Sequence, residues 1–207
     1  MKWLKPIAFI PLLALMALLV VAALMTTRAG YSSGAVVKTE AKTQPKPELK
    51  SELNVLAGIT PSFELTDRNG AVVKESQFRG KHVLLGFGFT HCGHICPTQV
   101  ANMAKALQSK AVPAVGIFVS VDTERDTPVI TDDYASKFGP AMMGLSGSYQ
   151  QVAKAAENFQ VSYVVSKSAD SYTVQHSSSI YLLNPQGDLV DVFPFNAPPA
   201  TLAQAFE

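Results

Sequence analysis

The sequence has little charge and almost no cysteine. Charged residues make up 16% of its 207 residues, and 17 basic against 16 acidic side chains leave a net charge of +1 at pH 7. This balance lacks the basic excess with which proteins neutralise phosphates, so we expect no nucleic-acid partner. The chain also lacks internal repeats, which argues against a repeat architecture. Its two cysteines allow at most one disulfide within the chain.

One long apolar run stands out at the N-terminus. Residues 7–25, IAFIPLLALMALLVVAALM, carry no charge. A helix of this length, at ~1.5 Å per residue, would be roughly 28 Å long, about one hydrocarbon core. Lys2 and Lys5 precede the run, which is typical of an N-terminus kept on the cytoplasmic side. The sequence predicts an uncleaved anchor over residues 1–25. A cleaved signal peptide is the alternative, although Arg28 would then lie within the cleavage region.

The remaining chain divides into a polar segment and a domain. Residues 26–55 are rich in Ser, Thr, Lys, Glu and Pro and have too few large apolar side chains for a core, so they are expected to form a flexible linker. Residues 56–207 are long enough to bury about 68–70% of their unfolded surface. One globular domain is therefore expected there.

The pattern of apolar runs and turn residues in this domain predicts a thioredoxin-like α/β fold. Strands are expected over residues 63–66, 71–73, 82–89, 114–121, 172–175, 180–183 and 189–193, and helices over 97–108, 127–138, 149–159 and 199–206. Strands that alternate with helices imply a parallel sheet with right-handed crossovers. The last strands and the final helix then add a closing antiparallel hairpin and a terminal helix.

Both cysteines lie where a buried strand is expected to meet a helix. Cys92 and Cys96 occur in the segment FTHCGHICP, and Pro97 fits a first helical position. Sites in open α/β sheets gather at this edge, and the free N–H groups of a helix start favour a thiolate. The two sulfurs could hold one metal ion or form one disulfide, but not both, because ligation requires thiolates.

Two sulfurs make a poor metal site, so the four histidines are the candidates for a third ligand. His82 begins a buried strand and is interpreted as an end-of-strand residue without a function. His91 and His94 flank the cysteines, and their contact with a metal stays open. His176 lies at the break before a later buried strand, where an isolated histidine would usually be structural.

Three segments in order resemble the Sco/SenC family. They are FTHCGHICP at residues 89–97, VSVDTERDTP at 119–128 and YTVQHSSSIYLLNPQG at 172–187. The resemblance covers residues 56–207 and agrees with the anchor and linker. Two departures are clear: Gly93 and His94 replace the Pro-Asp that the family usually shows, and Asn184 replaces an aspartate.

The resemblance implies a copper site formed by Cys92, Cys96 and His176. It also implies two partners, the copper-bearing subunit of cytochrome c oxidase and a copper donor protein. With the anchor, it predicts a single-pass protein of a bacterial inner membrane whose domain faces the periplasm. Two thiolates and an imidazole suit Cu(I), and Cu(II) is a second state to consider. Zinc would want a fourth ligand, which His91 or His94 could supply.

Two further groups of residues are candidates for the site. The loop over residues 122–126 contains three acidic side chains and Arg125. From its charge it is interpreted as solvated and self-paired, whereas the resemblance suggests that Asp122 and its neighbours shape the edge of the site or a partner surface. Met142 and Met143 could be thioether ligands, but adjacent methionines are more typical of core filling.

Two functions from different classes follow. The first is a metallochaperone that passes copper to an oxidase subunit, for which no catalytic turnover is needed. The second is a thiol–disulfide oxidoreductase whose Cys92–Cys96 pair reduces the copper-site cysteines of a partner. Thioredoxin-like reductases resemble one another in a proline at the position of Ser178, so its replacement favours the metal. A peroxiredoxin-type peroxidase shares the fold but gives His176 no evident part.

Overall fold

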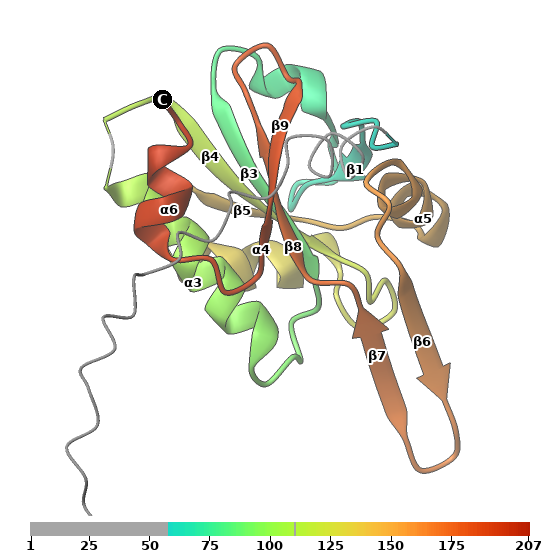
Figure 1. The fold of residues 1–207 in the computed structure, drawn as a ribbon. Coiled ribbons are helices and arrows are strands. Elements are labelled where there is room, and N and C mark those ends of the chain that lie inside the picture. Colours follow the sequence, from blue (N-terminus) through green and yellow to red (C-terminus); the bar gives the residue numbers. More distant parts are fainter. Residues whose placement is uncertain (1–57, 110) are drawn as a thin grey trace, which may run out of the picture. The chain divides into compact units, whose positions relative to one another are not determined.

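The computed structural model describes residues 58–109 and 111–207 (Figure 1). The anchor predicted over residues 1–25 and the linker predicted over 26–55 lie outside these residues. Within the described part of the chain, no helix is both long and apolar enough to cross a bilayer.

A five-stranded mixed sheet forms the centre of the domain. Its strands, in spatial order, are β5 (Met142–Leu145), β4 (Ala114–Ser120), β3 (His82–Gly88), β8 (Ser179–Leu183) and β9 (Leu189–Pro194). Strands β3, β4 and β5 run parallel, whereas β8 and β9 are antiparallel to their neighbours. Parallel strands joined through helices followed by an antiparallel hairpin confirm the predicted plan.

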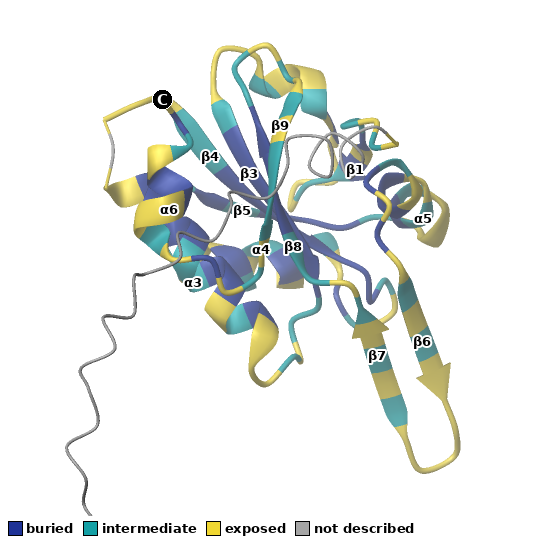
Figure 2. Cartoon of the chain, in the orientation of Figure 1, coloured by how far each residue is buried: buried dark blue, intermediate teal, exposed yellow. Residues whose placement is uncertain are grey.

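Both faces of the sheet are covered. One face carries α3 (Ile95–Gln108), α4 (Pro128–Ser136) and α6 (Pro199–Gln204), and the other carries α5 (Tyr149–Asn158), the hairpin of β1 (Glu64–Thr66) and β2 (Val72–Lys74), and the short helix η1 (Glu75–Phe78). Side chains of a strand alternate between the faces, so Leu84 and Leu85 enter opposite clusters. Figure 2 shows the central strands as the most buried part.

Local sequence signals explain where two of these helices begin. Thr127 caps α4 by accepting a hydrogen bond from the Ile130 N–H, and proline follows at the first helical position. Ser148 and Gln151 form a reciprocal capping box at the start of α5. These starts lie within a residue or two of the predicted ones.

Three features differ from the prediction. Helix α3 begins at Ile95, two residues before the expected start, which places Cys96 inside its first turn. Strand β5 was not expected. Strand β7 (Tyr172–His176) pairs with an unexpected strand, β6 (Tyr163–Lys167), in a separate hairpin rather than joining the closing one. Neither strand of this hairpin has a fully buried residue, so it lacks the apolar signal of a core strand.

Candidate metal centre

Cys92 and Cys96 come together where β3 ends and α3 begins. We call residues 89–94, which join these elements, the cysteine loop. Cys96 is fully buried in the first helical turn, and its backbone N–H lies 3.4 Å from the Cys92 sulfur and donates to it. A Cβ at Gly88 would lie 2.8 Å from the Cys96 sulfur, so this strand end accommodates the thiol only because it is a glycine. Both cysteines are free.

His176 reaches the cysteines through strand pairing that the sequence does not reveal. Strand β8 runs antiparallel to β3, with Ile180 opposite Gly86, so β8 begins where β3 ends. His176 precedes β8 and therefore lies beside the cysteine loop. Its Nε2 is 3.5 Å from the Cys96 sulfur, and its ring meets Phe89 edge-on at 5.8 Å between centroids.

The two thiols have opposite electrostatic environments. Burial raises the pKa of Cys92, but hydrogen bonds from Cys96 and from backbone N–H groups at the start of α3 outweigh it, so this pKa is below its ordinary value. Burial and the neighbouring Cys92 sulfur raise the pKa of Cys96 well above its ordinary value. Without a metal, Cys92 is thus the readier nucleophile of the pair.

The hydrogen bonding of His176 leaves one ring nitrogen free to act as a ligand. Nδ1 lies 2.9 Å from the Ser177 carbonyl oxygen, which can only accept, so Nδ1 carries the proton. The lone pair of Nε2 therefore faces the Cys96 sulfur. Burial lowers the pKa of His176, partly opposed by the bond to Ser177, and this favours the neutral ring that binds metals.

The buried carboxylate of Asp126 holds the cysteine loop in place. The sequence did not single out this residue as structural. Asp126 accepts hydrogen bonds from the Thr90 N–H at 2.7 Å, the Thr90 hydroxyl at 2.6 Å and the Ser120 hydroxyl at 2.6 Å. The side chain of Asp126 has no exposed surface. The interpretation of residues 122–126 as a solvated loop is therefore wrong for Asp126. The only signal available was its place in the loop that follows a buried strand, six residues after Ser120.

Asp122 is also fully buried, so that interpretation is wrong for it too. Its carboxylate accepts from the Arg125 Nε and from the Tyr172 hydroxyl, each at 2.6 Å. Burial, followed by the bond to Asp122, raises the pKa of Tyr172 to about 12. Self-pairing was predicted correctly for Arg125, but the bond to a strand fifty residues away was not.

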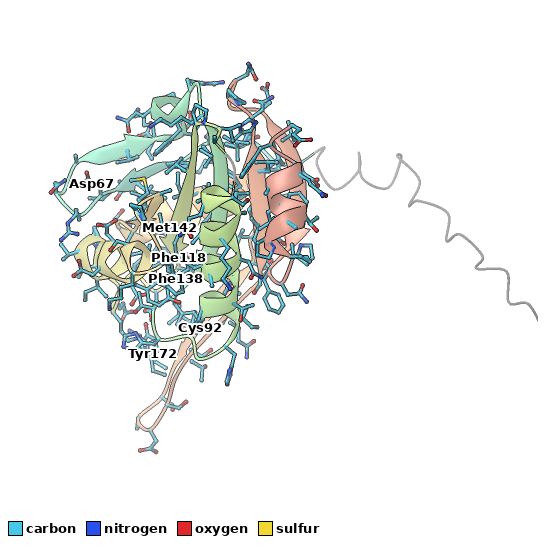
Figure 3. The ribbon with its side chains drawn as sticks, turned by 90° about the vertical axis from the view of Figure 1, so that its left-hand side faces the viewer. Asp67, Cys92, Phe118, Phe138, Met142 and Tyr172 are labelled. Carbon is cyan, nitrogen blue, oxygen red and sulfur yellow. The ribbon has the colours of Figure 1, made fainter. Side chains whose placement is uncertain are left out.

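Cys92 and Tyr172 both lie at the end of the domain from which the β6–β7 hairpin projects (Figure 3).

The other candidate ligands lie elsewhere or point away. His82 sits at the opposite end of β3 and packs against Phe206, as expected of an end-of-strand residue. His91 is half-exposed with its Nδ1 near Thr90 and Asp126, and His94 is exposed at the N-cap of α3. The two methionines fill the core on opposite faces of β5: Met142 in the cluster of α3, and Met143 against the other.

The three predicted ligands form a row rather than a closed set. Cys92 contacts Cys96, and Cys96 contacts His176. Among residues 58–109 and 111–207, no three His, Cys, Asp or Glu side chains are gathered tightly enough to enclose a metal ion. The arrangement offers two sulfurs and one imidazole nitrogen, a donor set that suits a soft metal ion. The same two sulfurs are adjacent enough for thiol–disulfide chemistry.

Known proteins are similar to this chain in sequence and in fold. The mitochondrial SCO1 homolog 1 of Arabidopsis thaliana is 36% identical over 145 residues, which cover 68% of this chain and 43% of the relative. The chain spans about half the length of several curated relatives that it matches.

Two copper-bound structures are similar to this chain. Bradyrhizobium japonicum ScoI with copper bound is 36% identical with a TM-score of 0.62, covering 72% of this chain and 97% of that one. Yeast Sco1 with copper bound is 29% identical with a TM-score of 0.64, covering 72% and 86%. The SCO1/SenC family model matches residues 52–207, most of the chain. With this match and the thioredoxin-like fold, the chain belongs to the SCO1/SenC family.

Proposed function

We propose that this protein is a metallochaperone that binds copper through Cys92, Cys96 and His176 and delivers it during the assembly of cytochrome c oxidase. The observation that carries the proposal is the 3.5 Å approach of the His176 Nε2 to the Cys96 sulfur. These residues are separated by eighty positions in the chain and meet only through the fold. The copper-bound relatives from Bradyrhizobium and yeast support copper as the cargo.

The donor chemistry favours copper in its reduced state. Two thiolates and one neutral imidazole are soft or borderline ligands, which suit Cu(I), and Cu(II) could occupy the same atoms. The lowered pKa of Cys92 and the neutral state favoured for His176 both reduce the cost of freeing these ligand atoms from a proton. The high pKa of Cys96 means that its proton would leave only as the metal binds.

The partners follow from the family and from the predicted anchor. A domain tethered to a membrane could meet the copper-bearing subunit of the oxidase and a copper donor protein at the same surface. We place the chain in a bacterial inner membrane, single-pass, with residues 56–207 facing the periplasm. No catalytic turnover is needed for this role, because copper passes from one set of ligands to another.

A second candidate function is thiol–disulfide exchange with a partner. It is favoured by the hydrogen bond from the Cys96 N–H to the Cys92 sulfur and by the lowered pKa of Cys92. In this reaction Cys92 would be the attacking thiol, and the buried Cys96 would be the second thiol of the pair. His176 has no necessary part in this chemistry. The two candidates therefore differ in what they require of His176.

A comparison of three variants separates these functions. His176→Ala removes a metal ligand and keeps both sulfurs, Cys96→Ser disables both functions, and His82→Ala is a matched control because it removes a half-buried histidine far from the sulfurs. Cu(I) affinity of the reduced protein is measured by competition with a chelator, and oxidase activity in a complemented deletion strain. We expect His176→Ala to lose affinity and oxidase activity. Full oxidase activity from His176→Ala, with none from Cys96→Ser, would reject delivery in favour of thiol exchange.

A further inference from the structure

The loop between β4 and α4 contacts both segments that carry the proposed ligands. We call residues 121–127 the bridging loop. Asp126 holds the cysteine loop through Thr90, and Asp122 holds strand β7 through the Tyr172 hydroxyl. Both carboxylates are fully buried. One short loop therefore fastens two parts of the site that are far apart in sequence.

Two residues of this loop, Asp122 and Arg125, contact Tyr172. The tyrosine hydroxyl donates to the carboxylate at 2.6 Å, and the Arg125 guanidinium carbon lies 3.9 Å from the centre of the tyrosine ring. Arg125 itself donates to the other oxygen of Asp122 at 2.6 Å. Hydrogen bonds to a carboxylate are stronger than those between neutral groups. The bond from the Tyr172 hydroxyl to Asp122 is also partly buried, so water competes less with it.

Tyr172 and His176 lie at the two ends of the same strand, β7, so holding one restricts the position of the other. Alternate residues of a strand share a face, so Tyr172, Val174 and His176 point the same way, and all three are half-buried while the residues between them are exposed. The hairpin has no fully buried residue, and its packing against the core comes from partly buried side chains, Tyr163 and Val174. The Lys167–Glu124 ion pair also joins the hairpin to the bridging loop, but it is exposed, and such pairs contribute little.

We infer that Asp122 and Tyr172 are positioning residues for His176. By fixing the orientation of β7, they hold the imidazole nitrogen beside the Cys96 sulfur before copper arrives. The entropy of placing the third ligand is then lost during folding rather than during binding, which strengthens binding. The cysteine pair is held separately by Asp126 and Thr90. This inference rests on the proposed function, and it assigns Asp122 and Tyr172 to copper affinity but not to thiol chemistry.

The test uses the reduced full-length protein in detergent micelles. Tyr172→Phe removes the hydroxyl and keeps the ring for Arg125. We expect its Cu(I) affinity to fall about tenfold, which corresponds to about 1.4 kcal/mol. Glu124→Gln, the matched control, breaks the exposed link between the same hairpin and the same loop, keeps Lys167 beside the Tyr172 ring, and should bind as the wild type does.

Three further readouts distinguish positioning from general weakening. Amide hydrogen exchange of the metal-free protein should quicken over residues 163–176 in Tyr172→Phe. The Cys92–Cys96 disulfide potential should stay unchanged in this variant. Added to His176→Ala, Tyr172→Phe should cause no further loss of Cu(I) affinity, because no third ligand is left to position.

The possible failures are separable. If Tyr172→Phe binds Cu(I) as tightly as the wild type while His176→Ala binds weakly, the positioning role is wrong and the proposed copper site stands. A further loss of affinity when Tyr172→Phe is added to His176→Ala, or a changed disulfide potential, would also overturn the positioning role. If His176→Ala itself binds as the wild type does, the proposed site fails, and the inference fails with it.

Discussion

Asp126 offers a severe test of how the cysteine loop is held. Its carboxylate accepts three short hydrogen bonds, two from Thr90 and one from Ser120, and it is completely buried. Asp126→Ala removes the acceptor oxygens of all three hydrogen bonds at once. The Thr90 N–H and two hydroxyl groups are then left to find water or other partners in a crowded interior.

The expected cost follows from these contacts. A buried donor left without a partner costs about 1–3 kcal/mol, and removing the charged acceptor also removes its own desolvation penalty. We therefore expect a net loss of about 3 kcal/mol in the free energy of unfolding. For a domain of about 150 residues, this lowers the melting temperature by about 6–12 °C. Asp126→Asn, which keeps one acceptor oxygen, should lose about half as much or less.

The assay is thermal unfolding of the reduced, metal-free protein, followed by circular dichroism. Asp133→Ala is the matched control, because Asp133 is an exposed carboxylate whose only described ion pair, to Arg68, is 3.3 Å long. Its removal should change stability by less than about 1 kcal/mol. If Asp126→Ala melted within a degree or two of Asp133→Ala, the buried network would not be what holds the cysteine loop in place.

Three other predictions follow from the site and its surroundings. A Cys92–Cys96 disulfide, confirmed by mass, should abolish Cu(I) binding, and oxidised protein that bound as tightly as reduced protein would contradict the ligand assignment. Iodoacetamide at pH 7 should modify Cys92 at least about tenfold faster than the buried Cys96, as read by peptide mass mapping, and equal labelling would contradict the opposite pKa shifts. Burial lowers the pKa of His82 below 6.5, so as the pH falls this histidine takes up a proton in the unfolded protein before it does so in the folded protein. The stability that neutral His82 contributes is therefore complete above pH 6.5 and is lost as the pH falls below it. Urea unfolding between pH 7 and pH 5 should accordingly show a smaller loss of stability in His82→Gln, and an unchanged loss would refute the assignment.

The cysteine half of the site could be predicted because its signals are local. An apolar run of strand length, a short loop with two cysteines and a proline suited to a helix start all lie within a few residues of one another. The structure places them as expected, except that α3 begins at Ile95. This difference puts Cys96 inside the helix and buries its sulfur, which spacing alone does not determine.

The hairpin that carries His176 shows the limit of pattern reading. Strand β6 has β-branched residues but no buried ones, and half of its side chains or more are exposed, so its pattern differs little from that of a loop. Its pairing with β7 stabilises both strands through backbone hydrogen bonds, which carry no signature of their own in the sequence. The prediction of a solvated loop over residues 122–126 was wrong for a related reason. Acidic side chains such as Asp122 and Asp126 are expected to be exposed unless their distant hydrogen-bond partners are known.

The class of fold, the cysteine pair and, through a resemblance to a family, the histidine to consider could all be predicted from the sequence. This was possible because apolar periodicity and short motifs are properties of neighbouring residues. The folded chain was needed to show that the His176 nitrogen faces the Cys96 sulfur, and that two buried aspartates hold the segments on either side. The contact between His176 and Cys96 depends on the antiparallel register of β8 against β3, which brings together residues that are eighty positions apart. Such a register is set by the packing of the whole sheet, and no short stretch of sequence specifies it.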